Sequence, residues 1–138
     1  MNKKRLSSLV AVLGLAVASP VLAGCAGGPV VSCDGKANNV HHSTGTPSSM
    51  DGKATGTCTA AVSITGYVEI QQKTKSGWSS IKRTSFSLVT APNKKFTRQT
   101  ATKCRKGTFR TYSYVVGTYK GQSETRRSTS GETKNPCS

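Results

Sequence analysis

The five cysteines have the most constrained chemistry in this chain, because their side chains can form disulfides or carry a covalent modification. An odd number of cysteines in an exported protein leaves one thiol without a disulfide partner. Cys25 is nearest the amino terminus, and Cys33, Cys58, Cys104 and Cys137 form an even set. We therefore predict that Cys25 is modified and that the other four cysteines form two disulfides.

The segment before Cys25 has the order of a secretory signal. Lys3, Lys4 and Arg5 are followed by an apolar run from Leu9 to Ala18 and then by small residues. That run is shorter than the roughly 20 residues needed to span a bilayer. We predict that residues 1–24 are a cleaved signal peptide, and that the mature protein folds where disulfides persist.

Leu22-Ala23-Gly24-Cys25 resembles the lipobox of bacterial lipoprotein precursors. The resemblance implies cleavage before Cys25, diacylglycerol on its sulfur, fatty-acid (palmitate) modification, and anchoring on the extracytoplasmic face of the cell membrane. The alternative is cleavage by the ordinary signal peptidase between Ala23 and Gly24, which would release a secreted protein. The cysteine count favours lipidation, because it leaves an even number of thiols to pair.

Histidine chemistry is confined to one adjacent pair, His41 and His42. Neighbouring side chains in extended backbone point in opposite directions, so the pair suits a metal site poorly. A small basic ribonuclease would need a histidine beside Glu69 and a cation at the phosphate, and no spacing brings these groups together. We predict no catalytic residue, no metal site and no cofactor.

Cations and tyrosines near the carboxyl-terminal third are the candidate anion-binding residues: Arg98, Lys103, Arg105, Lys106, Arg110, Tyr112 and Tyr114. Strand alternation puts Arg110, Tyr112 and Tyr114 on one face. Cations interleaved with aromatic residues resemble a platform for stacking or anion binding. We favour a different interpretation, in which Tyr112, Tyr114 and Val116 face the core and Arg110 lies at its rim. The platform remains the alternative.

Period-two alternation of apolar and polar residues from Cys58 to Ile70 predicts a strand. Its length predicts a bend or a crossing between sheets at Thr65-Gly66. A return strand over residues 78–87 completes a hairpin, with a bulge between Lys82 and Ser85. Further strands are predicted at residues 96–104, 109–119 and 123–130. Residues 34–55 are mostly small and polar, which predicts a long loop.

Six to eight short strands separated by turns predict an all-β protein, a sandwich or small barrel. Four short stretches resemble small exported proteins, mainly actinobacterial. They are the motif Cys104-x-x-Gly107-Thr108-Phe109-Arg110 and the segments Val68-Glu69-Ile70-Gln71, Ser76-Gly77-Trp78 and Val115-Val116-Gly117. The resemblance covers roughly residues 58–121 and implies an immunoglobulin-like antiparallel β-sandwich. Of the three possible disulfide connectivities, we favour Cys33–Cys58 with Cys104–Cys137.

Removing the signal leaves 114 residues, enough for one small domain. We predict a lipid-anchored tether at 25–29 and a sandwich domain at 30–138, poor in apolar residues and stapled by its disulfides. Three of the twenty Lys and Arg leave with the signal while all five acids stay, so the mature net charge is +12. A field of that sign attracts anionic polymers and lipid headgroups.

These features predict a non-catalytic binding or structural module, held on the cell envelope by lipid on Cys25. Its partners would be the membrane and an anionic envelope polymer, with no specific nucleic acid. One alternative is a released basic effector or antimicrobial protein. Another is a small ribonuclease-like hydrolase that depends on His41 and His42.

Overall fold

A computed structural model describes residues 31–138. The predicted signal peptide, the tether and Cys25 lie outside the described residues. Strands make up the regular structure of the described part, which has no helix capable of crossing a membrane. The strands are β1 Cys33–His42, β2 Ser49–Cys58, β3 Ser63–Thr74, β4 Gly77–Val89, β5 Lys95–Lys103, β6 Thr108–Tyr119, β7 Gln122–Thr129 and β8 Thr133–Lys134.

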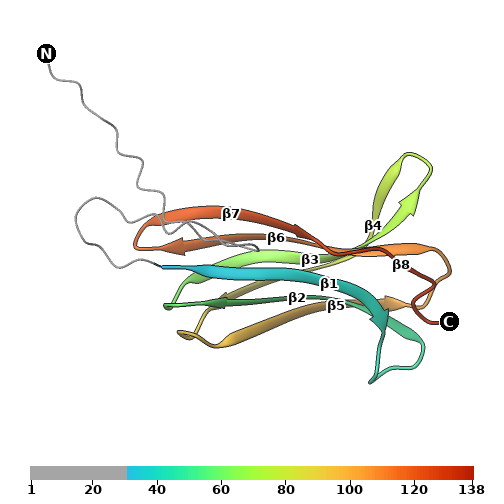
Figure 1. Ribbon diagram of the computed structural model, residues 1–138, viewed down its shortest axis with the longest axis horizontal. Helices are drawn as coiled ribbons and strands as arrows, with labels where there is room; N and C mark the ends of the chain where they lie inside the picture. The colour runs from blue at the N-terminus through green and yellow to red at the C-terminus, as the bar shows by residue number, and fades with distance from the viewer. Residues whose placement is uncertain (1–30) are drawn as a thin grey trace, which may run out of the picture.

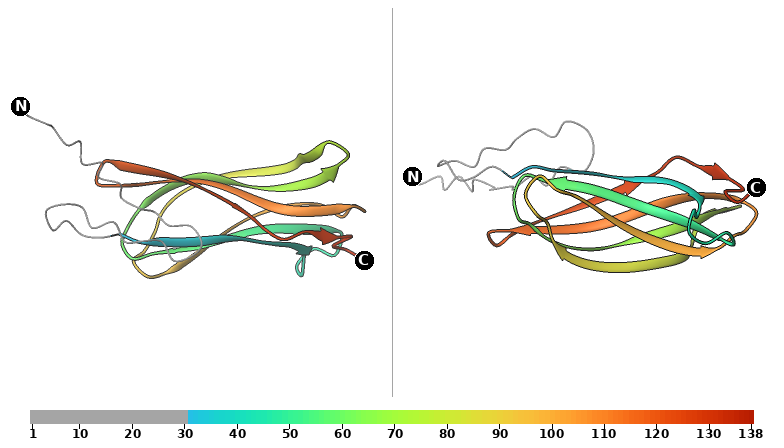
Figure 2. Two further views of the ribbon diagram at one scale, coloured as in Figure 1. Left: turned by 45° about the horizontal axis from the view of Figure 1, so that its top comes forward. Right: turned by 90° about the horizontal axis from the view of Figure 1, so that it is seen from below.

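Two antiparallel sheets form the domain. One has the order β1-β2-β5, and the other has the order β4-β3-β6-β7 with β8 paired to β6 (Figure 1). The sheets stack as two layers, as the turned views show (Figure 2). The predicted immunoglobulin-like β-sandwich is confirmed. Because β4 pairs with β3, the second sheet presents a face four strands wide.

The predicted loop at residues 34–55 is wrong, because this segment forms most of the β1–β2 hairpin. Cys33 pairs with Cys58 and Asn38 pairs with Lys53, with a bulge before His41. The inward positions hold small residues such as Ala37 and Gly52, both buried. A Cβ on Gly52 would lie 2.9 Å from a side-chain atom of Ile70, so the facing sheet requires a residue without a side chain there.

Two apolar clusters fill the space between the sheets. One contains Val31, Cys33, Cys58, Val62 and Ile64, and the other contains Val40, Met50, Ile70 and Phe109. Along β6 the buried residues include Phe109, Thr111 and Ser113. Tyr112 and Tyr114 therefore lie on the opposite, outer face, and the sequence-based assignment of these tyrosines to the core is wrong.

The chain crosses between sheets at residues 59–62, earlier than the predicted Thr65-Gly66. Gly66 lies within β3, paired with Phe86 on one side and Val115 on the other. A Cβ on Gly66 would lie 2.1 Å from the backbone oxygen of Tyr114. The glycine therefore allows β3 and β6 to approach closely where a bend was expected.

A bulge in β4 falls at Ile81, just before the predicted interval from Lys82 to Ser85. Ile70 pairs with Lys82 while Gln71 pairs with Ser80, which leaves Ile81 as the extra residue. This one-residue shift moves Trp78 onto the same sheet face as Arg83.

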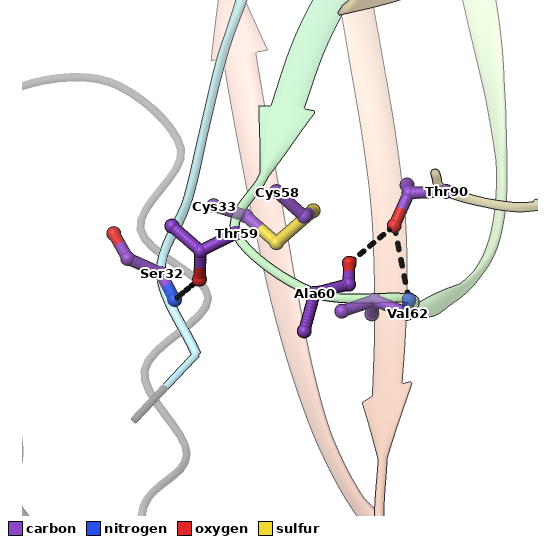
Figure 3. Close-up of a disulfide and its surroundings, with 7 residues drawn as sticks. All are labelled: Ser32, Cys33, Cys58, Thr59, Ala60, Val62 and Thr90. Atoms are coloured by element: carbon purple, nitrogen blue, oxygen red, sulfur yellow. Dashed lines mark hydrogen bonds between the residues drawn. A yellow bond between two sulfur atoms is a disulfide. The ribbon is translucent and has the colours of Figure 1, made fainter. Parts of the chain in front are cut away.

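Both favoured disulfides, Cys33–Cys58 and Cys104–Cys137, are present. Cys33 and Cys58 are direct cross-strand partners with Cα atoms 4.1 Å apart. Figure 3 shows this disulfide beside the 59–62 crossing, where the Thr90 hydroxyl accepts a bond from the Val62 amide and donates one to the Ala60 carbonyl. The disulfide thus holds β1 to β2 at this end, and Thr90 fixes the crossing to the end of β4.

Candidate anion-binding face

The outer face of the four-stranded sheet collects the aromatic and cationic side chains. In register across the sheet, Tyr67 of β3 pairs with Tyr114 of β6, which pairs with Arg127 of β7. One step along the strands, Glu69 pairs with Arg83 of β4 and with Tyr112 of β6. The tyrosine–arginine face comprises Tyr67, Trp78, Arg83, Arg110, Tyr112, Tyr114 and Arg127.

Four of these side chains form a continuous stack across all four strands. The Arg83 guanidinium carbon lies 3.9 Å from the ring centroid of Tyr67. The Tyr67 and Tyr114 rings are stacked with centroids 5.4 Å apart and planes 15° apart. The Arg127 guanidinium carbon lies 5.1 Å from the Tyr114 centroid. Cation–π attraction at each end and ring stacking in the middle hold the stack together.

Glu69 is an acidic side chain on this face, and only 3% of its side chain is exposed. Arg83 donates from Nε to Glu69 Oε2 at 2.7 Å, and its Nη2 lies 2.6 Å from the same oxygen. Gln71 donates to Oε1 at 2.6 Å. Arg110 in turn donates to Gln71 Oε1 at 2.7 Å, and its guanidinium carbon lies 4.1 Å from the Trp78 ring centroid. Two arginines are thus oriented through one buried carboxylate and one amide.

Ionisation follows from these contacts. Burial acts to raise the pKa of Glu69, but hydrogen bonds from Gln71, Arg83 and Ser80 outweigh it and hold the pKa below the usual 4.5. Burial raises the pKa of the Tyr67 phenol above the usual 10.0, despite the neighbouring Arg83. At neutral pH the face therefore holds a carboxylate under its arginines and a phenol that keeps its proton.

We expect Glu69→Gln to lower stability at pH 7 by about 1–2 kcal/mol, because it removes the charge from buried hydrogen bonds. The lowered pKa of Glu69 means that its stabilisation is present above pH 4.5 and is lost as pH falls through the folded-state value. The gap between wild type and Glu69→Gln, measured by urea unfolding, should therefore close in acid. Glu132→Gln is the control, since its pair with Lys73 is half-exposed. A gap that persists unchanged at low pH would contradict this account.

The remaining candidate anion-binding residues fall in two other places. Arg98 of β5 lies across the open edge of the sandwich, with its guanidinium carbon 6.0 Å from the Phe86 ring centroid of the opposite sheet. Lys103, Arg105 and Lys106 are exposed at the end of β5 and in the turn before β6. The structure therefore groups Arg110, Tyr112 and Tyr114 and separates the other four from them.

The histidines and Glu69 are not brought together. His41 and His42 end β1 in the three-stranded sheet, whereas Glu69 lies on the outer face of the other sheet. A ring nitrogen of His42 lies within 4.8 Å of the sulfurs of Cys104 and Cys137. Those sulfurs are bonded to each other, so they offer no thiolate ligand.

Sequence reasoning missed Tyr67, Trp78, Arg83 and Arg127 as members of one site. The available signal was parity, since Tyr67 alternates with the buried Val68 and shares its face with Glu69 and Gln71. The pairing of β3 with both β4 and β6 was the missing information.

No protein-family model matches the chain, and no curated protein matches it.

Proposed function

We propose that this protein is a lipid-anchored module of the bacterial cell envelope that binds an anionic polymer, without catalysis, through the tyrosine–arginine face. The observation that carries the proposal is that the face holds oriented arginines whose charge is only partly neutralised. Ion pairs within residues 31–138 involve Lys73, Arg83 and Arg126. Arg110 and Arg127 pair with no carboxylate in this part of the chain.

Pre-orientation makes these arginines suited to binding. A free arginine side chain loses rotamer entropy when a ligand fixes it, about 0.5–1.5 kcal/mol. Arg110 is already held by Gln71 and Trp78, and Arg127 by Tyr114. An anion therefore meets guanidinium groups whose ordering cost has largely been met by folding.

The anchoring point supports a partner in the envelope. Cys33 follows Cys25 by eight residues in the sequence. At about 3.5 Å per residue, that length keeps the disulfide-bonded end of the sandwich within roughly 28 Å of a lipid on Cys25. The turn between β5 and β6, which contains Arg105 and Lys106, lies at the opposite end of the sandwich from the start of β1 (Figure 1). These two cations thus lie at the end of the sandwich farther from Cys33.

Removal of the two unpaired arginines tests the proposal. We expect Arg110→Gln with Arg127→Gln to weaken binding to inorganic polyphosphate by about tenfold at low salt. The slope of log affinity against log salt should shrink by about 1.5, because each lost phosphate contact removes about 0.7–0.9 from it. Binding is measured by calorimetry from about 50 to about 200 mM salt.

The matched control removes the same charge elsewhere. Lys36 and Lys53 lie on β1 and β2 of the other sheet, so Lys36→Gln with Lys53→Gln lowers net charge equally. Equal losses in the two double variants would mean that the attraction belongs to the whole molecule. A wild-type affinity that does not change with salt concentration would contradict anion binding altogether.

A further inference from the structure

We infer that the tyrosine–arginine face binds the phosphate oxygens of a polymer only through the edges of its aromatic rings and guanidinium groups. Its ligand would then be a base-free phosphodiester chain of the polyol-phosphate type. This inference rests on the proposed function and adds the ligand's chemical class. Aromatic platforms for single-stranded nucleic acid work differently, because they offer an open ring face on which each base stacks.

The strand order closes the ring faces. Tyr67 lies on β3, between Arg83 of β4 and Tyr114 of β6, and both neighbours contact its ring. Tyr114 lies between Tyr67 on one side and Arg127 of β7 on the other, and again both are in contact. These two rings therefore have a partner on each flank, and a base or sugar ring would have to break the stack to lie on either of them.

The other two aromatic residues are engaged as well. The Trp78 ring has the Arg110 guanidinium carbon 4.1 Å from its centroid and Lys73 Nζ at 5.9 Å. Tyr112 packs against Tyr67 with centroids 6.2 Å apart and planes tilted by 41°. On Tyr67 and Tyr114, ring edges and phenol O–H groups remain for a ligand, together with the guanidinium N–H groups of the face. All of these O–H and N–H groups can donate, and oxygens of a phosphodiester accept.

The spacing of the arginines favours a chain over a single anion. Arg127 of β7 pairs with Tyr114, which lies four residues along β6 from Arg110, or about 13 Å at roughly 3.3 Å per residue. One phosphate or carboxylate cannot contact both guanidinium groups at hydrogen-bond distance. A flexible polymer with a charge on each repeat can contact both at once. A polyol-phosphate chain meets this requirement and has no bases, for which Tyr67 and Tyr114 offer no open ring face.

The decisive comparison uses two oligonucleotides, one with bases and one without. Oligothymidine and an abasic oligonucleotide with the same phosphates are titrated against the purified protein by fluorescence anisotropy. We expect dissociation constants within about twofold of each other, since base stacking adds nothing. A glycerol-phosphate oligomer with the same number of phosphates should compete with both equally well. Arg110→Gln with Arg127→Gln should weaken all three to a similar extent.

The outcomes separate the inference from the proposed function. Oligothymidine binding tenfold or more tightly than the abasic strand would overturn edge-only recognition, since one stacked base contributes about 1–3 kcal/mol, and anion binding would stand. Failure of all three polymers to bind, or binding that the double variant leaves unchanged, would overturn the proposed function. Vesicles of phosphatidylglycerol and phosphatidylcholine could also compete better than the polymers, per accessible phosphate. That result would identify a lipid surface as the ligand and overturn the assignment of the ligand as a polymer.

Discussion

Cys25→Ser should abolish lipid labelling of the protein in its host and leave a precursor longer by residues 1–24. Serine has no sulfur to form the thioether, so neither the diacylglycerol nor the cleavage that depends on it should follow. Each buried methylene of an acyl chain contributes about 0.8 kcal/mol, and two chains give stable anchoring where one does not. The variant should therefore lose stable membrane anchoring completely. Incorporation of labelled palmitate and the mass of the amino-terminal peptide measure it.

The control for lipidation is a variant that loses other thiols. Cys33→Ser with Cys58→Ser removes one disulfide and should leave palmitate incorporation intact. Recovery of wild-type protein that begins at Gly24 with an unmodified Cys25 would establish ordinary secretion. The envelope-anchored role would then give way to the released basic effector.

The part of the fold that could be predicted is the part with apolar alternation. Ile64, Val68 and Ile70 are all buried along β3, as the alternation indicated. The β1–β2 hairpin was missed because the inward positions of its strands are largely Gly and Ala, which carry little hydrophobic signal. Its small residues are needed because larger neighbours, Ile70 and Phe96, fill the space opposite Gly52 and Gly56. Those neighbours are distant in sequence, so the composition of residues 34–55 alone predicted a loop.

The sequence predicted which residues share a strand face in the site, but not whether that face points to the core or to the outside. Arg110, Tyr112 and Tyr114 were correctly placed on one face of a strand, yet that face was assigned to the core. Phe109, Thr111 and Ser113 take the core positions, and two of them are hydroxyl-bearing residues that a hydrophobicity pattern scores as exposed. A sandwich that buries threonine and serine inverts the usual pattern.

Reducing both disulfides should bring the domain close to unfolding at 37 °C. Closing loops of 25 and 33 residues stabilises the fold by about 3.5 kcal/mol each in the chain-entropy description. Their sum, about 7 kcal/mol, is comparable with the whole stability of a small domain. Trp78 is the only tryptophan, and Arg110 covers it, so its fluorescence in a thermal scan reports both unfolding and loss of the face. A melting temperature shifted by only a few degrees under a strong reductant would contradict this.

The two disulfides should also be reduced in a fixed order, because they differ in burial. Cys33 and Cys58 lie within an apolar cluster and are 4% and 0% exposed, whereas Cys104 and Cys137 are half-buried near the carboxyl terminus. A thiol reductant must reach a sulfur to attack it, so Cys104–Cys137 should open first. Quenching at intervals with an alkylating agent and mapping by mass spectrometry gives the order. Cys104→Ala with Cys137→Ala is the reference, and its remaining disulfide should resist reduction until the sandwich itself opens.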